Sequence, residues 1–465
     1  MNLGKTESVC PVCLKRIPAE RTARGGDVYL DKLCPEHGAF SALVWRGGLG
    51  KEFDKWRSYA PPADADLSSI SIPGNKTCCA LVEVTKRCDL RCPVCFAESG
   101  DSAAEPSVRE LSETFRALAD AGNTFVQLSG GEPTVRDDLP EIVAAARRAG
   151  CETVQLNSNG LRLGREPGFT KALADAGLSF VFMQFDGVTD GVYKALRGLP
   201  LLAEKRAAIE VCDRENIGVT LVPTLVPGVN DGELGEIIAF AVRHSPAVRG
   251  VHFQPVSYFG RYRDIVPCRV TRTPVAGTVY GGSSPRMRRS PCAHARTIAP
   301  AINRAPTHPP DNARITLPEV LRAIESQTSG KFKIRDFNPS SCDHPCCGFH
   351  GDFVVLPKGR IMKLTKKYDP DACCAADAHL KNRSFVARRW TRPDELNGLA
   401  AQSGDTDYRD MSAFLSRVKS HGFTISAMAF QDAWTLDLER LRRCSLHVAD
   451  GARVTPFCAR YLTKA

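Results

Sequence analysis

The stretch CALVEVTKRCDLRCPVCFAES, residues 79–99, decides how the rest of the chain is interpreted. Its apolar, β-branched first part predicts a buried strand at 79–86, and three cysteines follow at once in the spacing C-x3-C-x2-C. Three thiolates on so short a loop can bind three irons of a cubane [4Fe–4S] cluster and leave the fourth iron without a protein ligand. We therefore predict that Cys88, Cys92 and Cys95 hold a reactive cluster. A partial zinc site or three unrelated thiols are the alternatives for this motif alone.

Strands and helices alternate regularly after this stretch. Ser107 and Glu110 predict a capping box, and Leu111, Phe115 and Leu118 share one face of the helix that follows. Strands separated by helices predict parallel βα units, hence an open sheet or a partial barrel. In either geometry, ligands bind at the carboxyl ends of the strands. The predicted buried strands are 79–86, 124–129, 152–157, 179–185, 217–224 and 248–256.

Polar motifs stand at the ends of three of these strands. LSGGEP (128–133) offers two glycines that let a backbone approach a ligand and a glutamate that can accept from an ammonium group. LNSNG (156–160) suits ribose hydroxyls or a carboxylate, and MQFDG (183–187) adds an amide and a carboxylate. The alternatives are ordinary strand-to-loop turns and, for Asp186, a helix N-cap. The candidate binding residues at these ends are Gly130, Gly131, Glu132, Asn157, Ser158, Asn159, Gln184 and Asp186.

With these motifs in place, residues 78–263 resemble the core of the radical S-adenosylmethionine (SAM) superfamily. The resemblance implies a partial (β/α)6 barrel in which SAM chelates the open iron, the GGE motif meets the SAM amino group, and the other strand-end residues complete the pocket, with Arg197 nearby. It implies cleavage of SAM to a 5′-deoxyadenosyl radical that abstracts hydrogen from a substrate, with electrons from a reductase, a flavodoxin or a ferredoxin. The usual aromatic residue before the last cysteine is replaced by Val94.

A second metal site is predicted near the N-terminus. Cys10-Pro-Val-Cys13 and Cys34-Pro-Glu-His37 are two knuckles with the spacing of a zinc ribbon or rubredoxin-like site. Three sulfurs and one nitrogen favour zinc, with a mononuclear iron as the alternative. We expect this site to stabilise the fold rather than to do chemistry. Reduced surface thiols are the other interpretation.

The C-terminal part of the chain is also rich in cysteine. Cysteines spread over more than a hundred residues can converge as ligands of one or two auxiliary iron–sulfur clusters. Adjacent Cys346 and Cys347 could instead be redox-active. Cys373 or Cys374 is a weaker candidate, and any of His344, His350 and His447 could be a ligand or simply a surface residue. The predicted auxiliary ligands are Cys342, Cys346, Cys347, Cys444 and Cys458.

The chain is accordingly divided into an N-terminal metal module (1–58), the core (78–263), an irregular segment (264–312) and a cysteine-rich C-terminal extension (313–465). The irregular segment is proline-rich without helical or strand periodicity, so it is predicted to be an insertion or a translation of DNA in the wrong frame, which would spoil the barrel. Seven arginines and one acid in 265–312 supply +6 of the net charge of +10. The charge is therefore local, and no nucleic acid is expected as partner.

Nineteen cysteines in clusters favour metal ligation in a reducing compartment, while Cys151 and Cys212 are predicted to be buried thiols. No apolar run is long enough for a transmembrane helix, and the first residues lack a signal-peptide core, so we expect a cytoplasmic protein. The alternative to an enzyme is an iron–sulfur or zinc carrier, or a zinc-ribbon binding module.

The pattern VCPVCLK…CPEHG, core, FQPVS…RITLPEVLRAIE, then DLERLRRCSLH…PFC resembles one subgroup of this superfamily. That subgroup includes the archaeal tetraether lipid synthase and the bacterial radical SAM (seleno)protein family TrsS, and related proteins have been called pterin methylation enzymes. A lipid or another unactivated C–H bond is therefore the candidate substrate. The lipid-coupling enzymes carry a segment G-C-P-x-D-C-G-x-C before the first strand, where this chain has only Cys78 and Cys79. This departure puts the lipid and the set of auxiliary clusters in doubt.

Overall fold

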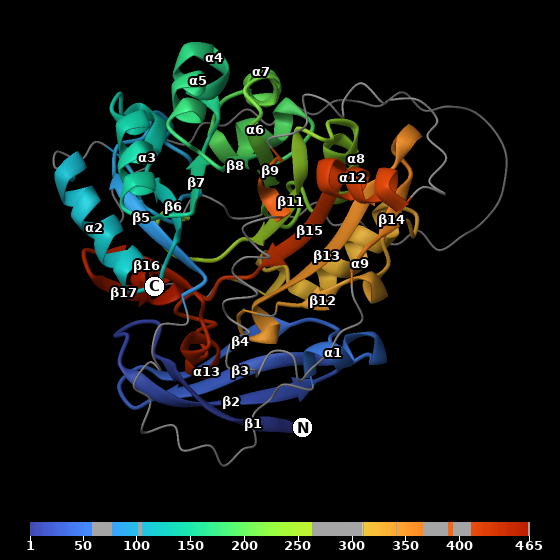
Figure 1. Ribbon diagram of the computed structural model, residues 1–465. Coiled ribbons are helices and arrows are strands. Elements are labelled where there is room, and N and C mark those ends of the chain that lie inside the picture. The colour runs from blue at the N-terminus through green and yellow to red at the C-terminus, as the bar shows by residue number, and fades with distance from the viewer. Residues whose placement is uncertain are drawn as a thin grey trace, which may run out of the picture.

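The N-terminal module is a four-stranded antiparallel sheet of consecutive strands (Figure 1). It is followed by the short helix α1 (Asp54–Arg57). The computed structural model describes residues 1–57, 77–100, 105–262, 309, 311–340, 342–365, 389–393 and 411–463. The strands of the module are β1 (Asn2–Val9), β2 (Arg16–Arg24), β3 (Asp27–Cys34) and β4 (Gly38–Trp45).

The core sheet contains the six predicted strands in parallel, in the order β5-β6-β7-β8-β9-β11. Each lies within two residues of its predicted bounds, because long apolar β-branched runs between helical patterns are a strong signal. The short β10 (Thr224–Leu225) pairs beside β11. The core strands are β5 (Cys79–Thr85), β6 (Phe125–Gly130), β7 (Thr153–Ser158), β8 (Phe180–Gln184), β9 (Gly218–Val222) and β11 (Val248–Pro255).

Helices cover the outer face of these strands (Figure 1). The predicted capping box opens the first of them, since the Ser107 backbone N–H donates to Glu110 and the Glu110 N–H donates to the Ser107 hydroxyl. The predicted buried thiols Cys151 and Cys212 lie in the core. The helices are α2 (Val108–Asp120), α3 (Leu139–Arg148), α4 (Leu161–Arg165), α5 (Pro167–Asp175), α6 (Asp190–Arg197), α7 (Leu202–Arg214) and α8 (Leu234–Arg243).

The C-terminal extension adds strands to both edges of the core sheet, which its cysteine content alone does not predict. β15 pairs in parallel with β11, and β16 pairs in parallel with β5. Both core edges thereby gain hydrogen-bond partners, as exposed strand edges require. Together they form a single sheet with the order β12-β13-β15-β11-β9-β8-β7-β6-β5-β16-β17, in which β14 pairs with β13. The added strands are β12 (Asn338–Pro339), β13 (Gly348–Val355), β14 (Ile361–Lys363), β15 (Gly422–Met428), β16 (Leu446–Asp450) and β17 (Arg453–Pro456).

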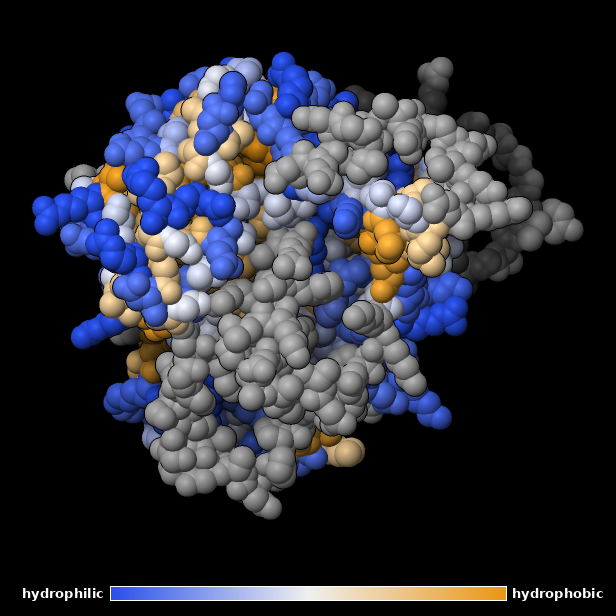
Figure 2. Space-filling model, viewed as in Figure 1, coloured by the Kyte–Doolittle hydropathy of each residue, from blue (hydrophilic) through white to orange (hydrophobic). Residues whose placement is uncertain are grey.

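Among the described residues, these strands are accompanied by the helices α9 (Leu317–Gln327), α12 (Met411–His421), α13 (Leu438–Arg442) and α14 (Phe457–Arg460). The N-terminal module docks against α13, where Asp437 accepts from Thr6 (2.8 Å) and from Arg21 (2.7 Å). On the face in Figure 2, hydrophobic residues occur in small groups among hydrophilic ones. No helix in the described part of the chain combines the length and apolarity needed to cross a membrane. Most of 264–312, and Cys373 and Cys374, lie outside the described residues.

Candidate functional site

The loop that carries Cys88, Cys92 and Cys95 begins at the carboxyl end of β5, as the sequence predicts. We call residues 86–100 the cysteine loop. Its last cysteine forms a two-way backbone bridge with Arg261, after β11, with both N–H···O distances at 2.9 Å. All three cysteines line one cavity. The two ends of the parallel core therefore meet at the cysteine loop and fix its position.

Two glycines at the end of β6 hold this loop from the other side. The Gly131 N–H donates to Thr85 O (2.8 Å), and the Glu132 N–H donates to Arg87 O (2.9 Å). A Cβ atom at Gly131 would lie 2.0 Å from Arg87 O, and one at Gly130, where φ is +127°, would lie 1.9 Å from Thr85 O. The two glycines thus allow the backbone at Thr85 and Arg87 to approach closely, and both also line the cavity, so their predicted role in ligand binding stays a prediction.

Glu132 joins the ends of β6 and β7. Its buried carboxylate accepts from Thr134, from the Ser158 hydroxyl (2.8 Å) and from the Asn159 N–H (2.6 Å). Asn159 in turn donates to Asp89 of the cysteine loop (2.6 Å). Burial raises the pKa of Glu132, and these hydrogen bonds only partly offset it. The network joins the LSGGEP motif, the LNSNG motif and the cysteine loop.

Gln184 and Asp186, at the end of β8, are positioned differently from one another. Asp186 is fully buried and pairs bidentately with Arg197, with both N···O distances at 2.7 Å, and it does not line the cavity. Arg197 does line it, and it also donates to Val94 O in the cysteine loop (3.2 Å). Gln184 lines the cavity, and its amide oxygen can accept from the same guanidinium at 3.2 Å. Asp186 therefore orients Arg197 and does not itself face a ligand.

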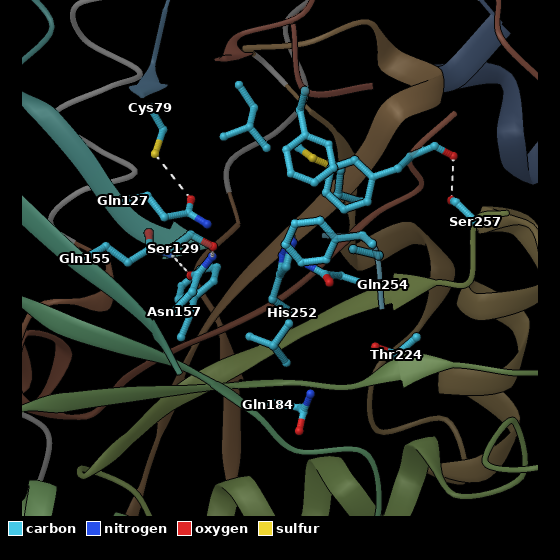
Figure 3. A pocket seen from close by; sticks show the side chains of 18 of the residues that line it. Cys79, Gln127, Ser129, Gln155, Asn157, Gln184, Thr224, His252, Gln254 and Ser257 are labelled. Atoms are coloured by element: carbon cyan, nitrogen blue, oxygen red, sulfur yellow. Dashed lines mark hydrogen bonds between the residues drawn. The ribbon is translucent and has the colours of Figure 1, made fainter. Parts of the chain in front are cut away.

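The cavity has a volume of about 350 Å³ and lies inside the parallel strands (Figure 3). The site residues that the sequence predicts are brought together around it, apart from Asp186. Burial raises the pKa of the Cys88 thiol to about 12, so a bound cation is needed to hold its thiolate at neutral pH. The predicted core residues that line the cavity are Cys88, Cys92, Cys95, Gly130, Gly131, Glu132, Asn157, Ser158, Asn159 and Gln184.

Sequence reasoning missed a deeper set of lining residues. Four of them lie two positions before a residue at a strand end, and alternation along the strands, which puts residues two apart on one face, could have found them. The fifth, Cys79, is the first residue of β5. Trp390 and Cys342 come from distant segments that no local signal connects to the barrel. The deeper lining residues on the core strands are Cys79, Gln127, Gln155, Phe182 and His252.

The N-terminal knuckles converge as predicted. The ligand atoms of Cys10, Cys13, Cys34 and His37 lie within 4.8 Å of one another, the one group of metal-binding type found at this spacing among the described residues. His37 Nδ1 is 3.5 Å from the Cys34 sulfur and 3.7 Å from that of Cys10. Three sulfurs and one imidazole at this spacing suit tetrahedral zinc.

The C-terminal cysteines lie in two places. Cys342 and Cys78 both line the cavity, and the neighbouring Cys78, together with burial, raises the pKa of the Cys342 thiol. Burial, with Cys458 and Cys347 nearby, raises the pKa of the Cys444 thiol, and burial, with Cys347 nearby, raises that of Cys458. Arg440 donates to the Cys347 sulfur at 3.5 Å. Cys346 approaches the backbone of Trp56.

The three histidines considered as ligands have protein partners. His344 accepts from the Cys346 N–H (3.2 Å), and His447 contacts Thr77 (3.1 Å). His350 lies 4.0 Å from Asp352. Burial lowers the pKa of His344 to about 3 and that of His350 to about 4, so both are neutral at physiological pH.

Comparison with known proteins finds two families in the chain. The radical SAM superfamily matches residues 82–241, and the HMPTM N-terminal zinc ribbon domain matches residues 2–46. The 7,8-dihydro-6-hydroxymethylpterin dimethyltransferase of Methanocaldococcus jannaschii is 31% identical, over 98% of this chain and 92% of that protein. The GTP 3′,8-cyclase of Paenarthrobacter nicotinovorans is 28% identical over 42% of this chain and 57% of its own length. SuiB of Streptococcus suis bound to S-adenosylmethionine is a similar solved structure, with a TM-score of 0.34, 15% identity, and 40% and 43% of the two chains covered.

Proposed function

Since the chain belongs to the radical SAM superfamily, and within it to the family of 7,8-dihydro-6-hydroxymethylpterin dimethyltransferase, we propose that it is a radical SAM methyltransferase acting on a reduced pterin. It is an enzyme that uses a [4Fe–4S] cluster and SAM. The identity of the substrate is what we propose beyond the family's cofactors. The observation that carries it is the 31% identity to that transferase, which extends over nearly the whole of both chains.

We assign the cluster to Cys88, Cys92 and Cys95. The assignment is supported by three thiols from one short loop that border one cavity, since thiolates are the ligands that iron–sulfur clusters require. When bound, the reduced cluster supplies the electron that cleaves SAM into methionine and a 5′-deoxyadenosyl radical.

The chain's own residues hold and orient SAM. We assign its binding to the strand-end residues Asn157 and Gln184, to Arg197 at the end of α6, and to Glu132, all of which line the cavity. Glu132 holds Ser158 and Asn159 at the end of β7, and Asp186 holds Arg197, before SAM arrives, which limits the reorganisation needed at the reaction. Aromatic and aliphatic walls, including Phe96, exclude water from the reactive carbon.

The other metal sites have supporting roles in this proposal. The N-terminal quartet is suited to zinc, and the docking of its module on α13 supports a role in stability. Cys347, Cys444 and Cys458, with Cys346 nearby, are proposed auxiliary-cluster ligands, and Cys342 with Cys78 a second candidate pair beside the cavity. A flavodoxin, a ferredoxin or their reductase is the proposed electron donor. The carrier hypothesis is not favoured, because the chain belongs to a family of enzymes.

Two products test the proposal in one experiment. Anaerobically reconstituted protein is given dithionite, SAM with a deuterated methyl group and 7,8-dihydro-6-hydroxymethylpterin. We expect 5′-deoxyadenosine and methionine from the SAM that is cleaved, with electrons from dithionite. We also expect a pterin that gains one deuterated methyl group for each further SAM converted to S-adenosylhomocysteine, and none of these products from Cys88→Ala protein. 5′-Deoxyadenosine without a methylated pterin would reject the substrate and keep the chemistry; neither product from protein with a full iron complement would reject both.

A further inference from the structure

Below the strand-end residues, the cavity carries a second layer of side chains. We call Gln127, Gln155, Phe182 and His252 the inner tier. They come from β6, β7, β8 and β11, each two residues before a residue at a strand end, and all four line the cavity. Figure 3 shows Gln127, Gln155 and His252 around it. None of them belongs to the motifs assigned to the cluster or to SAM. They therefore form the part of the cavity available to a second molecule.

The two glutamines of the inner tier are neighbours. Gln127 and Gln155 are register partners in adjacent parallel strands, so their side chains start about 4.8 Å apart. Gln127 Oε1 accepts from the Cys79 thiol (3.5 Å), and Gln155 Nε2 donates to Asn157 Oδ1 (2.9 Å). These bonds turn the amide nitrogen of one glutamine and the amide oxygen of the other to the cavity.

The two remaining amide atoms have no hydrogen bond to any residue that the structure describes. Gln155 is nevertheless 2% exposed. A buried polar group without a partner is costly, so such groups normally meet protein, water or ligand. The pair presents a donor beside an acceptor. It is complementary to a ligand edge that carries an acceptor beside a donor, as a lactam or an aminopyrimidinone does.

The rest of the inner tier is flat and uncharged. Phe182 lies 5.5 Å from the His252 ring and meets the edge of Trp390 at 5.6 Å between centroids. His252 is fixed by Ser426 (2.9 Å). Burial, with Arg389 nearby, lowers the pKa of His252 to about 4, so its ring is neutral at physiological pH. Neutral aromatic walls favour stacking by a planar ring.

We propose that the inner tier is a recognition subsite for a neutral heteroaromatic ring with a lactam-type edge, in which Gln127 and Gln155 read the edge and Phe182 and His252 receive the ring face. The subsite rests on the proposed function and names the residues that select the pterin. A lipid chain would leave both amide atoms without hydrogen-bond partners, which disfavours it at this place. The inner tier therefore selects the pterin over a lipid.

The test measures binding rather than turnover. Reconstituted protein with SAM is dialysed to equilibrium against 6-hydroxymethylpterin, and SAM binding is measured on the same samples. Gln127→Met and Gln155→Met keep side-chain length and remove the amide, and each is expected to weaken pterin binding about tenfold while SAM binding is unchanged. Gln327→Met, on α9 and outside the cavity, is the matched control and is expected to bind both as wild type does.

A ligand-side measurement keeps the test valid if a variant does not fold. Unsubstituted pteridine lacks the amino and oxo groups, and wild type should bind it about tenfold more weakly than the pterin. Equal binding of the two compounds, unchanged pterin affinity in both glutamine variants, or no pterin binding by wild type would each overturn the subsite. The formation of 5′-deoxyadenosine from SAM in the absence of pterin is measured separately. If it is formed, the radical SAM activity is retained even when the subsite is rejected.

Discussion

The close contact between the GGE motif and the cysteine loop makes Gly131→Ala the most informative single change. Gly131 has no positive φ, so the effect of the added methyl group is steric. Its Cβ would lie 2.0 Å from Arg87 O, whereas real Cβ contacts are essentially never under 3.0 Å. The loop must therefore shift by about 1 Å, a displacement that can cost about 100-fold in rate when it misplaces reacting groups.

The shift also breaks two backbone hydrogen bonds. These are the bonds from Gly131 N–H to Thr85 O and from Glu132 N–H to Arg87 O. At about 1–3 kcal/mol per buried hydrogen bond, the stability of the loop's position falls by about 2–6 kcal/mol. We expect lower iron per chain after reconstitution and about 100-fold less 5′-deoxyadenosine. The assays are iron quantification and chromatography of the nucleoside product.

Gly168→Ala is the matched control, because nothing lies within 4 Å of a Cβ atom at that position. It should retain the iron content and the rate of wild type. If Gly131→Ala also retains both, the glycines do not position the cysteine loop and the argument from this contact is refuted.

Three further predictions concern the ion pair between Asp186 and Arg197, the dependence of stability on pH, and the N-terminal metal site. Asp186→Asn leaves Arg197 as a buried unpaired charge and should lower the free energy of unfolding, measured in urea, by about 3–5 kcal/mol. Asp175→Asn, which breaks an exposed pair with Lys171, should change it by less than about 1 kcal/mol, and equal losses in the two variants would contradict the role of Asp186 as the buried partner of Arg197. Burial lowers the pKa of His421 from 6.5 to about 4, so the neutral ring's contribution to the free energy of unfolding is complete above pH 6.5 and is lost as the pH falls towards 4. His421→Asn should flatten the dependence of the free energy of unfolding on pH across this window by up to about 1.4 kcal/mol per pH unit, and an unchanged dependence would count against the assignment. Cys34→Ser should abolish zinc binding and lower the melting temperature, while Cys151→Ala keeps its zinc; full zinc content in Cys34→Ser would exclude the quartet as the metal site.

The core of the fold could be predicted because its signals are local. Six apolar runs, the Ser107 capping box and the spacing of Cys88, Cys92 and Cys95 each depend on a few consecutive residues. They predicted the parallel strands, their order along the chain and the edge at which the site lies. The knuckles Cys10–Cys13 and Cys34–His37 were predicted for the same reason.

What could not be predicted depends on contacts between distant segments. β15 and β16 extend the sheet at both edges, and Trp390 and Cys342 reach the cavity, over separations that no periodicity reports. Asp186 was predicted as a binding residue from its place at the end of a strand and from the resemblance to the family; in the structure it is fully buried against Arg197, on the following helix, and does not line the cavity. Side-chain direction at a strand end is set by such a partner.

The central claim is that SAM binds at the cluster held by the cysteine loop. Electron paramagnetic resonance of the anaerobically reduced protein, recorded before and after SAM is added, tests it most directly, with Cys92→Ala as control. The account predicts a cluster signal that changes when SAM binds and a SAM-responsive signal that is missing from the variant. A protein with a full iron complement whose spectrum is the same with and without SAM would contradict it.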